Sequence, residues 1–70
     1  MQLGQRIREL RGALSLTQQA LADRAGISIS FLSMIERSER LPHIKTLAAL
    51  SNALGITLSQ LFLDVNSQLR

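Results

Sequence analysis

The chain has 70 residues, 46% of them apolar, with no cysteine, one histidine (His43), and eight Lys and Arg against five Asp and Glu. So short a chain forms one domain. Its residues include no catalytic nucleophile with a general base to activate it, no glycine-rich phosphate loop and no set of metal ligands. The sequence therefore excludes a recognisable enzyme, metal site or cofactor site. Seven of the eight basic residues are arginine, whose planar guanidinium matches phosphate oxygens and guanine edges. This composition favours nucleic acid as the partner. The alternative is that the arginines form an ordinary solvated surface.

The N-terminal segment predicts a helix over about residues 2–14. Four apolar residues recur at steps of four, three and four: Leu3, Ile7, Leu10 and Leu14. This spacing places them on one face of a helix. Arg6 and Arg8 interrupt the segment before the apolar part of a signal peptide could form. No run approaches the ~20 apolar residues that span a bilayer, so we expect a cytoplasmic protein with no membrane association.

A second helix is expected from Thr17 to Gly26, and a third from Ser28 to about residue 36. Thr17 and Ser28 suit N-caps, because a side-chain hydroxyl accepts a hydrogen bond from a free amide of the first turn. Gly26 can adopt the left-handed backbone that ends a helix sharply. The inward-facing residues are Leu21, Ala22, Ala25, Ile27, Leu32 and Ile35. A connection of about three residues predicts the steep crossing of a helix-turn-helix.

The second half of the chain predicts two more helices. Ile44, Leu47, Leu50 or Ser51, and Leu54 define one face of a helix that lies between Pro42 and Gly55. "TLSQ", residues 57–60, has the spacing of a capping box and opens a short helix that carries Leu58, Leu61 and Phe62. "LDVNSQLR" lacks helical periodicity. We therefore expect an all-α, compact bundle of five short helices over residues 1–62, followed by a tail or the start of a linker over residues 63–70.

Four blocks of the sequence resemble, in this order and at these intervals, the phage Cro and repressor (Xre-like) family of helix-turn-helix regulators. They are "LGQRIRELR", "LTQQALADRAGIS", "FLSMIER" and "LPHIKTLAALSNALGIT", which span about residues 3–62. The resemblance implies a lambda-repressor-like domain that binds double-stranded DNA and represses or activates transcription, with repression the expected sign. It implies a homodimer that sets helix 28–36 in the major groove of a two-fold symmetric operator, and it leaves open a further C-terminal effector domain or a protein partner.

The resemblance assigns DNA contacts to two sets of residues. The base-facing positions hold Ser28, Ile29, Ser30, Ser33, Met34 and Arg37. Serine hydroxyls discriminate weakly among base edges, whereas Ile29 suits a thymine methyl group. Met34 has an alternative place on the rim of the core. The phosphate-facing positions hold Thr17, Gln18, Arg40 and Lys45, of which the first two begin a helix whose dipole and free amides attract an anion.

The resemblance also implies a buried ion pair between Arg11 and Glu36, which would join the first expected helix to the end of the third. The alternative is a surface pair between Glu36 and Arg40, four residues further on. Phe31 replaces the hydroxyl-bearing aromatic that is common in the family. We expect it to pack against the start of helix 44–54, with a position across the DNA backbone as the alternative.

Three further expectations concern the ends of helices and the partner. His43 stands where the family often has a capping serine, so its imidazole either accepts from a backbone amide or approaches a phosphate. A dimer interface is expected from four apolar residues near the C-terminus: Leu58, Leu61, Leu63 and Val65.

The rival function is a protein-interaction bundle or an antitoxin component, in which Ile29, Phe31 and Met34 contact a protein partner. The low polarity of "SISFLSM" favours this rival, whereas Gln18 and the arginines that follow the third helix favour DNA.

Overall fold

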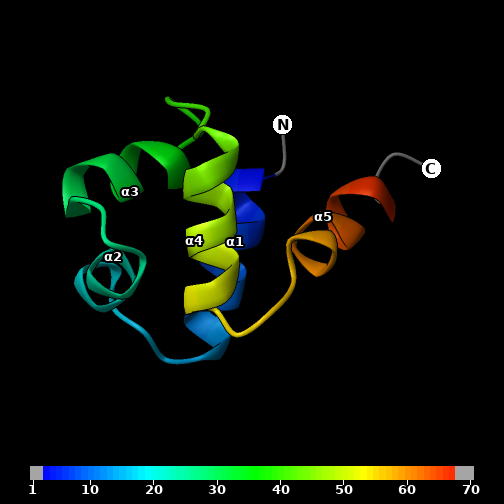
Figure 1. Ribbon diagram of the computed structural model, residues 1–70, viewed down its shortest axis with the longest axis horizontal. Helices are drawn as coiled ribbons and strands as arrows, with labels where there is room; N and C mark the ends of the chain where they lie inside the picture. The colour runs from blue at the N-terminus through cyan, green and yellow to red at the C-terminus, as the bar shows by residue number, and fades with distance from the viewer. Residues whose placement is uncertain (1–2, 68–70) are drawn as a thin grey trace.

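Five α-helices and no strand form residues 3–67, the part of the chain that the computed structural model describes (Figure 1). The helices are α1 (Leu3–Ala13), α2 (Gln18–Ala25), α3 (Ile29–Glu36), α4 (Ile44–Ala53) and α5 (Leu58–Ser67). The all-α, five-helix fold predicted from the sequence is therefore confirmed. None of the helices within residues 3–67 has the length and apolar character needed to cross a bilayer.

Side chains cap the starts of the helices at the positions that the sequence indicates. Thr17 Oγ1 accepts from the amide of Ala20 at 3.0 Å, and Ser28 Oγ accepts from the amide of Phe31 at 3.1 Å. Thr57 and Gln60 form the reciprocal capping box, with distances of 3.0 and 2.9 Å. At α4, His43 Nδ1 accepts from the amide of Lys45 at 3.2 Å. Of the two partners considered for the imidazole, a backbone amide and a phosphate, the structure thus shows the backbone amide.

The α2–α3 connection turns at Gly26, which has φ of 71° and ψ of 30°. This left-handed conformation suits glycine, because a Cβ would meet the following carbonyl. The amide of Ile27 then donates back to the carbonyl of Ala22 at 3.0 Å and closes the end of α2. Gly26 thus makes the turn that the sequence predicted.

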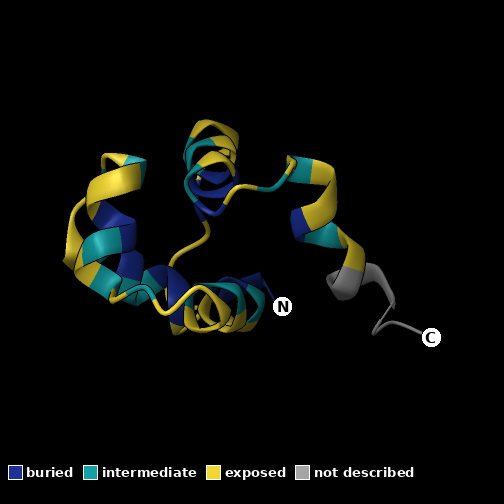
Figure 2. Cartoon of the chain, turned by 90° about the horizontal axis from the view of Figure 1, so that it is seen from below, coloured by how far each residue is buried: buried dark blue, intermediate teal, exposed yellow. Residues whose placement is uncertain are grey.

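The core lies where the apolar faces of the helices meet (Figure 2). α1 packs against α3 and α5, α2 packs against α3 and α4, and α4 packs against α5. The largest completely buried side chains are Ile7, Leu21, Leu32, Ile35, Leu50 and Leu61. Burying an aliphatic side chain of this size contributes roughly 1.5–3 kcal/mol, so this cluster holds α3 firmly by its inner face.

Gly4 allows α1 to touch the end of α3 backbone to backbone. A Cβ built on Gly4 would lie 2.4 Å from the carbonyl oxygen of Ile35 and 2.8 Å from that of Glu36. Such distances are too short for any side chain, so only glycine permits this approach. The contact holds the start of α1 directly against the end of α3.

The structure corrects three details of the sequence interpretation. Leu14 is 50% exposed, because α1 ends at Ala13 and Ser15, with φ of 57°, turns the chain away from the apolar face. Ile44 is 53% exposed in the first turn of α4, whose core face begins at Leu47. α5 continues to Ser67 and includes "LDVNS", for which the sequence showed no helical periodicity, since this stretch contains no glycine or proline that would stop a helix.

Candidate functional site

The surface of interest is built by α2, the turn and α3. The two helices pack closely and cross steeply, with the completely buried Ala22 on the inner side of α2 (Figure 1). Leu32, Ile35 and Glu36 are buried on the inner side of α3. The residues that are exposed or partly exposed on its outer side are Ile29, Ser30, Ser33, Met34 and Arg37. The helical period therefore presents one continuous outer face of α3 to solvent.

This outer face, together with the first residue of α2, forms an open groove of about 470 Å³. The groove is lined by Gln18, Ile29, Ser30, Ser33, Met34 and Arg37. Five of the six predicted base-facing residues thus lie together, and they are joined by one predicted phosphate-facing residue. None of the residues that line the groove carries a carboxylate, so its chemistry consists of hydroxyls, an amide, aliphatic groups and one guanidinium. The groove is suited to a partner that is neutral or negatively charged.

Ser28 is the predicted base-facing residue that does not line the groove. It is exposed at the start of α3, where its oxygen caps the helix. A hydroxyl that accepts one hydrogen bond can still donate another. Ser28 therefore keeps a donor at the edge of the groove.

A buried polar cluster supports the groove from behind. Arg11 Nε donates to Glu36 Oε2 at 2.8 Å, and Arg11 Nη2 donates to Glu36 Oε1 at 3.1 Å. Gln18 Nε2 also donates to Glu36 Oε1, at 3.1 Å, and Arg11 Nη1 donates to the carbonyl of Leu16 at 2.9 Å. The Glu36 side chain is only 3% exposed. The expected ion pair between Arg11 and Glu36 is present, and Gln18 connects it to the groove.

The alternative pair between Glu36 and Arg40 does not form. The Arg40 guanidinium instead lies over the Phe31 ring, 5.7 Å from its centroid, at a distance typical of a cation–π contact. Phe31 is half-buried and packs against the hydrophobic core. Arg40 is thereby held beside α3, where its charge stays in solvent.

Arg37, at the end of α3, makes an exposed ion pair with Glu39. Arg37 Nε donates to Glu39 Oε2 at 2.9 Å, and Nη2 donates to Oε1 at 3.0 Å. Nη1 donates to the hydroxyl of Ser33. Hydrogen bonding to Glu39, and then the charge of Glu39, raise the pKa of Arg37, while the hydrogen bonds from Arg37 lower the pKa of Glu39. The pair therefore stays charged on both sides at neutral pH.

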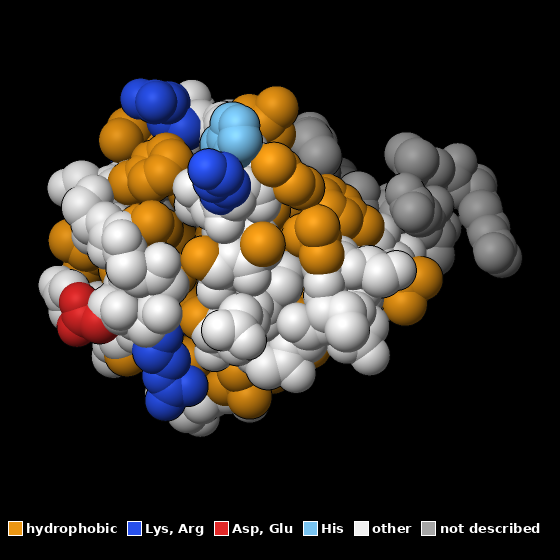
Figure 3. All heavy atoms as spheres, viewed as in Figure 1, with side chains coloured by type: hydrophobic (Ala, Val, Ile, Leu, Met, Phe, Trp, Pro, Cys, Tyr) orange, Lys and Arg blue, Asp and Glu red, His pale blue; other side chains and the backbone are white. Residues whose placement is uncertain are grey.

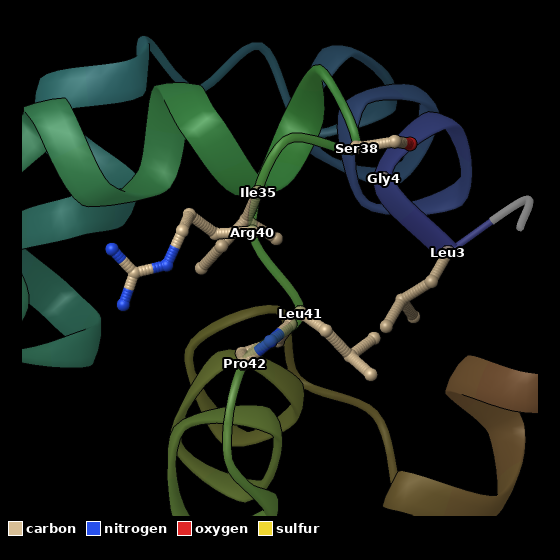
Figure 4. A pocket seen from close by; sticks show the side chains of 7 residues that line it. All are labelled: Leu3, Gly4, Ile35, Ser38, Arg40, Leu41 and Pro42. Atoms are coloured by element: carbon tan, nitrogen blue, oxygen red, sulfur yellow. The ribbon is translucent and has the colours of Figure 1, made fainter.

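The remaining predicted phosphate-facing cations are Arg40, in the segment between α3 and α4, and Lys45, in the first turn of α4. Arg40, His43 and Lys45 are exposed, and Figure 3 shows basic side chains and the histidine near the start of α4. A small apolar pocket of about 240 Å³ lies beneath this segment. Leu41 extends toward Leu3 across the pocket, whereas the Arg40 guanidinium points away from it (Figure 4). The Arg40 charge thus stands on the outer side of the segment.

The residues expected at a dimer interface do not form one exposed surface. Leu61 is completely buried in the core, so its assignment to an interface is wrong: the inner face of α5 is used within the chain. Leu58 is half-buried and packs against the core, while Leu63 is 59% exposed. Val65 lies outside the residues whose side chains the structure describes.

Gly4 and Glu39 shape the site but were missed by sequence reasoning. A glycine inside an otherwise regular amphipathic helix is a signal for a close approach, and Gly4 could have been found in this way. Glu39 gives no such signal, because residues two apart face each other in a turn but not along a helix. Its contact with Arg37 depends on the local backbone.

The chain is similar to known helix-turn-helix proteins along most of its length. The profile of the helix-turn-helix family matches residues 7–61. The chain is 46% identical over 59 residues to the immunity repressor protein of Bacillus phage phi105, a match that covers 84% of this chain and 41% of the repressor. It spans less than half the length of this repressor and of two of the other curated relatives that it matches.

Solved structures give the same result. The restriction-modification controller protein C.AhdI from Aeromonas hydrophila superimposes with a TM-score of 0.85 at 38% identity, over 87% of this chain and 92% of that protein. The DNA-binding domain of the P22 C2 repressor superimposes with a TM-score of 0.82 at 40% identity, over 86% of this chain and 79% of that domain. These similarities favour a regulator and not an enzyme.

Proposed function

Because the chain belongs to the helix-turn-helix family of transcriptional regulators, we propose that it binds double-stranded DNA with α3 in the major groove and represses transcription from a two-fold symmetric operator. The observation that carries this proposal is the groove along α3. It gathers Ile29, Ser30, Ser33, Met34 and Arg37 on the outer face of a single helix whose inner face is fixed in the core.

Within this proposal, the base-facing residues have different tasks. Ser30 and Ser33 can donate to or accept from base edges, and Ile29, 39% exposed, can pack on a thymine methyl group. Few of these side chains discriminate strongly on their own. Sequence preference therefore depends in part on DNA shape and on how phosphate contacts hold the domain in register.

Phosphate contacts are proposed on two sides of α3. At the start of α2, Thr17 and Gln18 stand where free amides and the helix dipole favour an anion. After α3, the exposed Arg40 and Lys45 provide positive charge for the neighbouring stretch of backbone. This arrangement would place the outer face of α3 between two phosphate contacts.

We further propose a homodimer whose two α3 helices enter half-sites about 34 Å apart. Since Leu61 belongs to the core, the exposed Leu63 of α5 is the proposed contact. A cytoplasmic location and a further C-terminal effector domain or protein partner stay predictions. The greater length of the phage repressor is consistent with a further domain.

The test is a selection of bound duplexes from a random pool, followed by a salt titration on the selected duplex. We expect a two-fold symmetric sequence and, if a dimer neutralises about six to eight phosphates, a log–log salt slope of roughly −5 to −7. Arg40→Ala should reduce the slope, whereas Arg8→Ala removes the same charge from exposed α1 and serves as the control. No enriched sequence and no salt dependence would contradict DNA binding.

One observation supports the rival function of protein binding, as an interaction bundle or an antitoxin component. Ile29 and Met34 line the same groove and are apolar, and a partner helix could use them as well as a base could. In that case Ile29→Ala would abolish capture of the partner and leave the DNA titration unchanged. Loss of DNA sequence preference in the same variant would argue against the rival.

A further inference from the structure

We propose that Glu39, together with Ser33, is a positioning residue that holds the Arg37 guanidinium ready to recognise a guanine in the operator. This inference rests on the proposed function and adds to it a residue outside the predicted base-facing and phosphate-facing sets. It makes Arg37 a base reader, in contrast to Arg40 and Lys45, which are proposed to bind phosphate.

Arg37 has two hydrogen-bond donors that Glu39 and Ser33 do not use. A guanidinium has five N–H groups, one on Nε and two on each terminal nitrogen. Glu39 takes the Nε group and one on Nη2, and Ser33 takes one on Nη1. Two donors remain, one on each of the neighbouring terminal nitrogens. Two such donors side by side are what the O6 and N7 acceptors of guanine require.

The turn after α3 fixes the backbone of Glu39 in place. Ser38 adopts φ of 62°, a left-handed conformation that reverses the chain directly after α3. The amide of Ser38 donates to the carbonyl of Ile35 at 3.0 Å, and the amide of Glu39 donates to that of Met34 at 2.8 Å. The backbone of Glu39 is therefore anchored to α3, and its carboxylate returns to Arg37, which lines the groove.

On DNA, this arrangement of Arg37 and Glu39 favours a specific site over an arbitrary sequence. A long exposed side chain loses rotamer freedom when it binds, and a guanidinium already held by two neighbours loses less. Glu39 also places a negative charge beside Arg37, which repels phosphate oxygens and so opposes binding to arbitrary sequences. Both effects raise the ratio between specific and non-specific affinity, which is the quantity that the pair controls.

The experiment uses the whole chain and the duplex obtained by selection. A guanine read by Arg37 is identified as the position where Arg37→Lys, which keeps the charge but lacks the fork, loses its preference for guanine. We expect the wild-type chain to prefer guanine over adenine there by about tenfold or more, and replacement by 7-deazaguanine, which lacks the N7 acceptor, to weaken binding. The measured quantity is this ratio, together with the affinity for an unrelated duplex.

Glu39→Gln should reduce the guanine preference several-fold and strengthen binding to the unrelated duplex. Glu9→Gln removes one exposed negative charge from α1 and should leave the guanine preference unchanged. Glu39→Asp keeps the charge but shortens the reach, and should also lose preference for guanine.

An unchanged guanine preference in Glu39→Gln, with tighter binding to every duplex, would overturn the inference and leave Glu39 as a competitor for Arg37. If the wild-type chain selects no sequence, the proposed function fails together with the inference. If it selects a sequence and Glu39→Gln keeps the guanine preference, the inference alone fails.

Discussion

Two ion pairs of the same chemistry lie at opposite sides of the end of α3. Arg11 and Glu36 are 18% and 3% exposed and connect α1 to α3, while Arg37 and Glu39 are both 54% exposed at the groove. The Nε to carboxylate distances are nearly equal, 2.8 and 2.9 Å. Their roles therefore differ because of their surroundings. A buried carboxylate must keep every partner, whereas water can replace a lost partner of an exposed one.

The largest effect is expected at the buried pair. Glu36→Gln removes the charge that compensates Arg11 and should lower the free energy of unfolding by about 3 kcal/mol or more. Urea denaturation followed by circular dichroism measures this change. A shift in the midpoint no larger than that of a surface variant would show that the pair is less desolvated than its 3% exposure indicates.

A smaller loss is expected where α1 meets the same end of α3. Gly4→Ala places a methyl group 2.4 Å from the carbonyl oxygen of Ile35, so one of the two helices must shift, at a cost of about 1–3 kcal/mol. Gly12→Ala is the matched control, because among the described residues no atom lies within 4 Å of its new methyl group. It should stabilise α1 by about 0.5–1 kcal/mol. Equal urea midpoints for the two variants would contradict the close helix contact.

The smallest effect on folding is expected at the exposed pair. Glu39→Gln makes the same chemical change as Glu36→Gln, yet it should leave the urea midpoint unchanged, because water replaces the lost partner. Its consequences should appear in DNA binding alone. A loss of stability comparable to that of Glu36→Gln would break the distinction between the two pairs.

The sequence predicted most of the fold because its signals are local. Thr17, Ser28 and the "TLSQ" box mark helix starts, Gly26 marks the turn, and the apolar periodicity selects the core faces of α2 and α3. The same period predicts which residues of α3 face outward together. The pairing of Arg11 with Glu36 came from the family resemblance, since residues 25 positions apart have no local relation.

What the sequence did not predict depends on tertiary geometry. Leu61 has the same apolar character as Leu63, and only the packing of α5 on α1 and α4 decides that the first is core and the second surface. Gly4 and Glu39 act through contacts with backbone and side chains that the turn after α3 brings together. Apolar character and charge alone do not show which of these residues meet.

The most direct test of the central claim, that α3 reads DNA, compares two classes of variant on two duplexes. Dissociation constants are measured for the selected duplex and for a scrambled one, with Ser30→Ala and Lys45→Ala as the variants. We predict that Ser30→Ala lowers the ratio of the two affinities, whereas Lys45→Ala weakens both duplexes alike. Equal effects of both variants on that ratio would contradict the assignment of α3 as the base-reading helix.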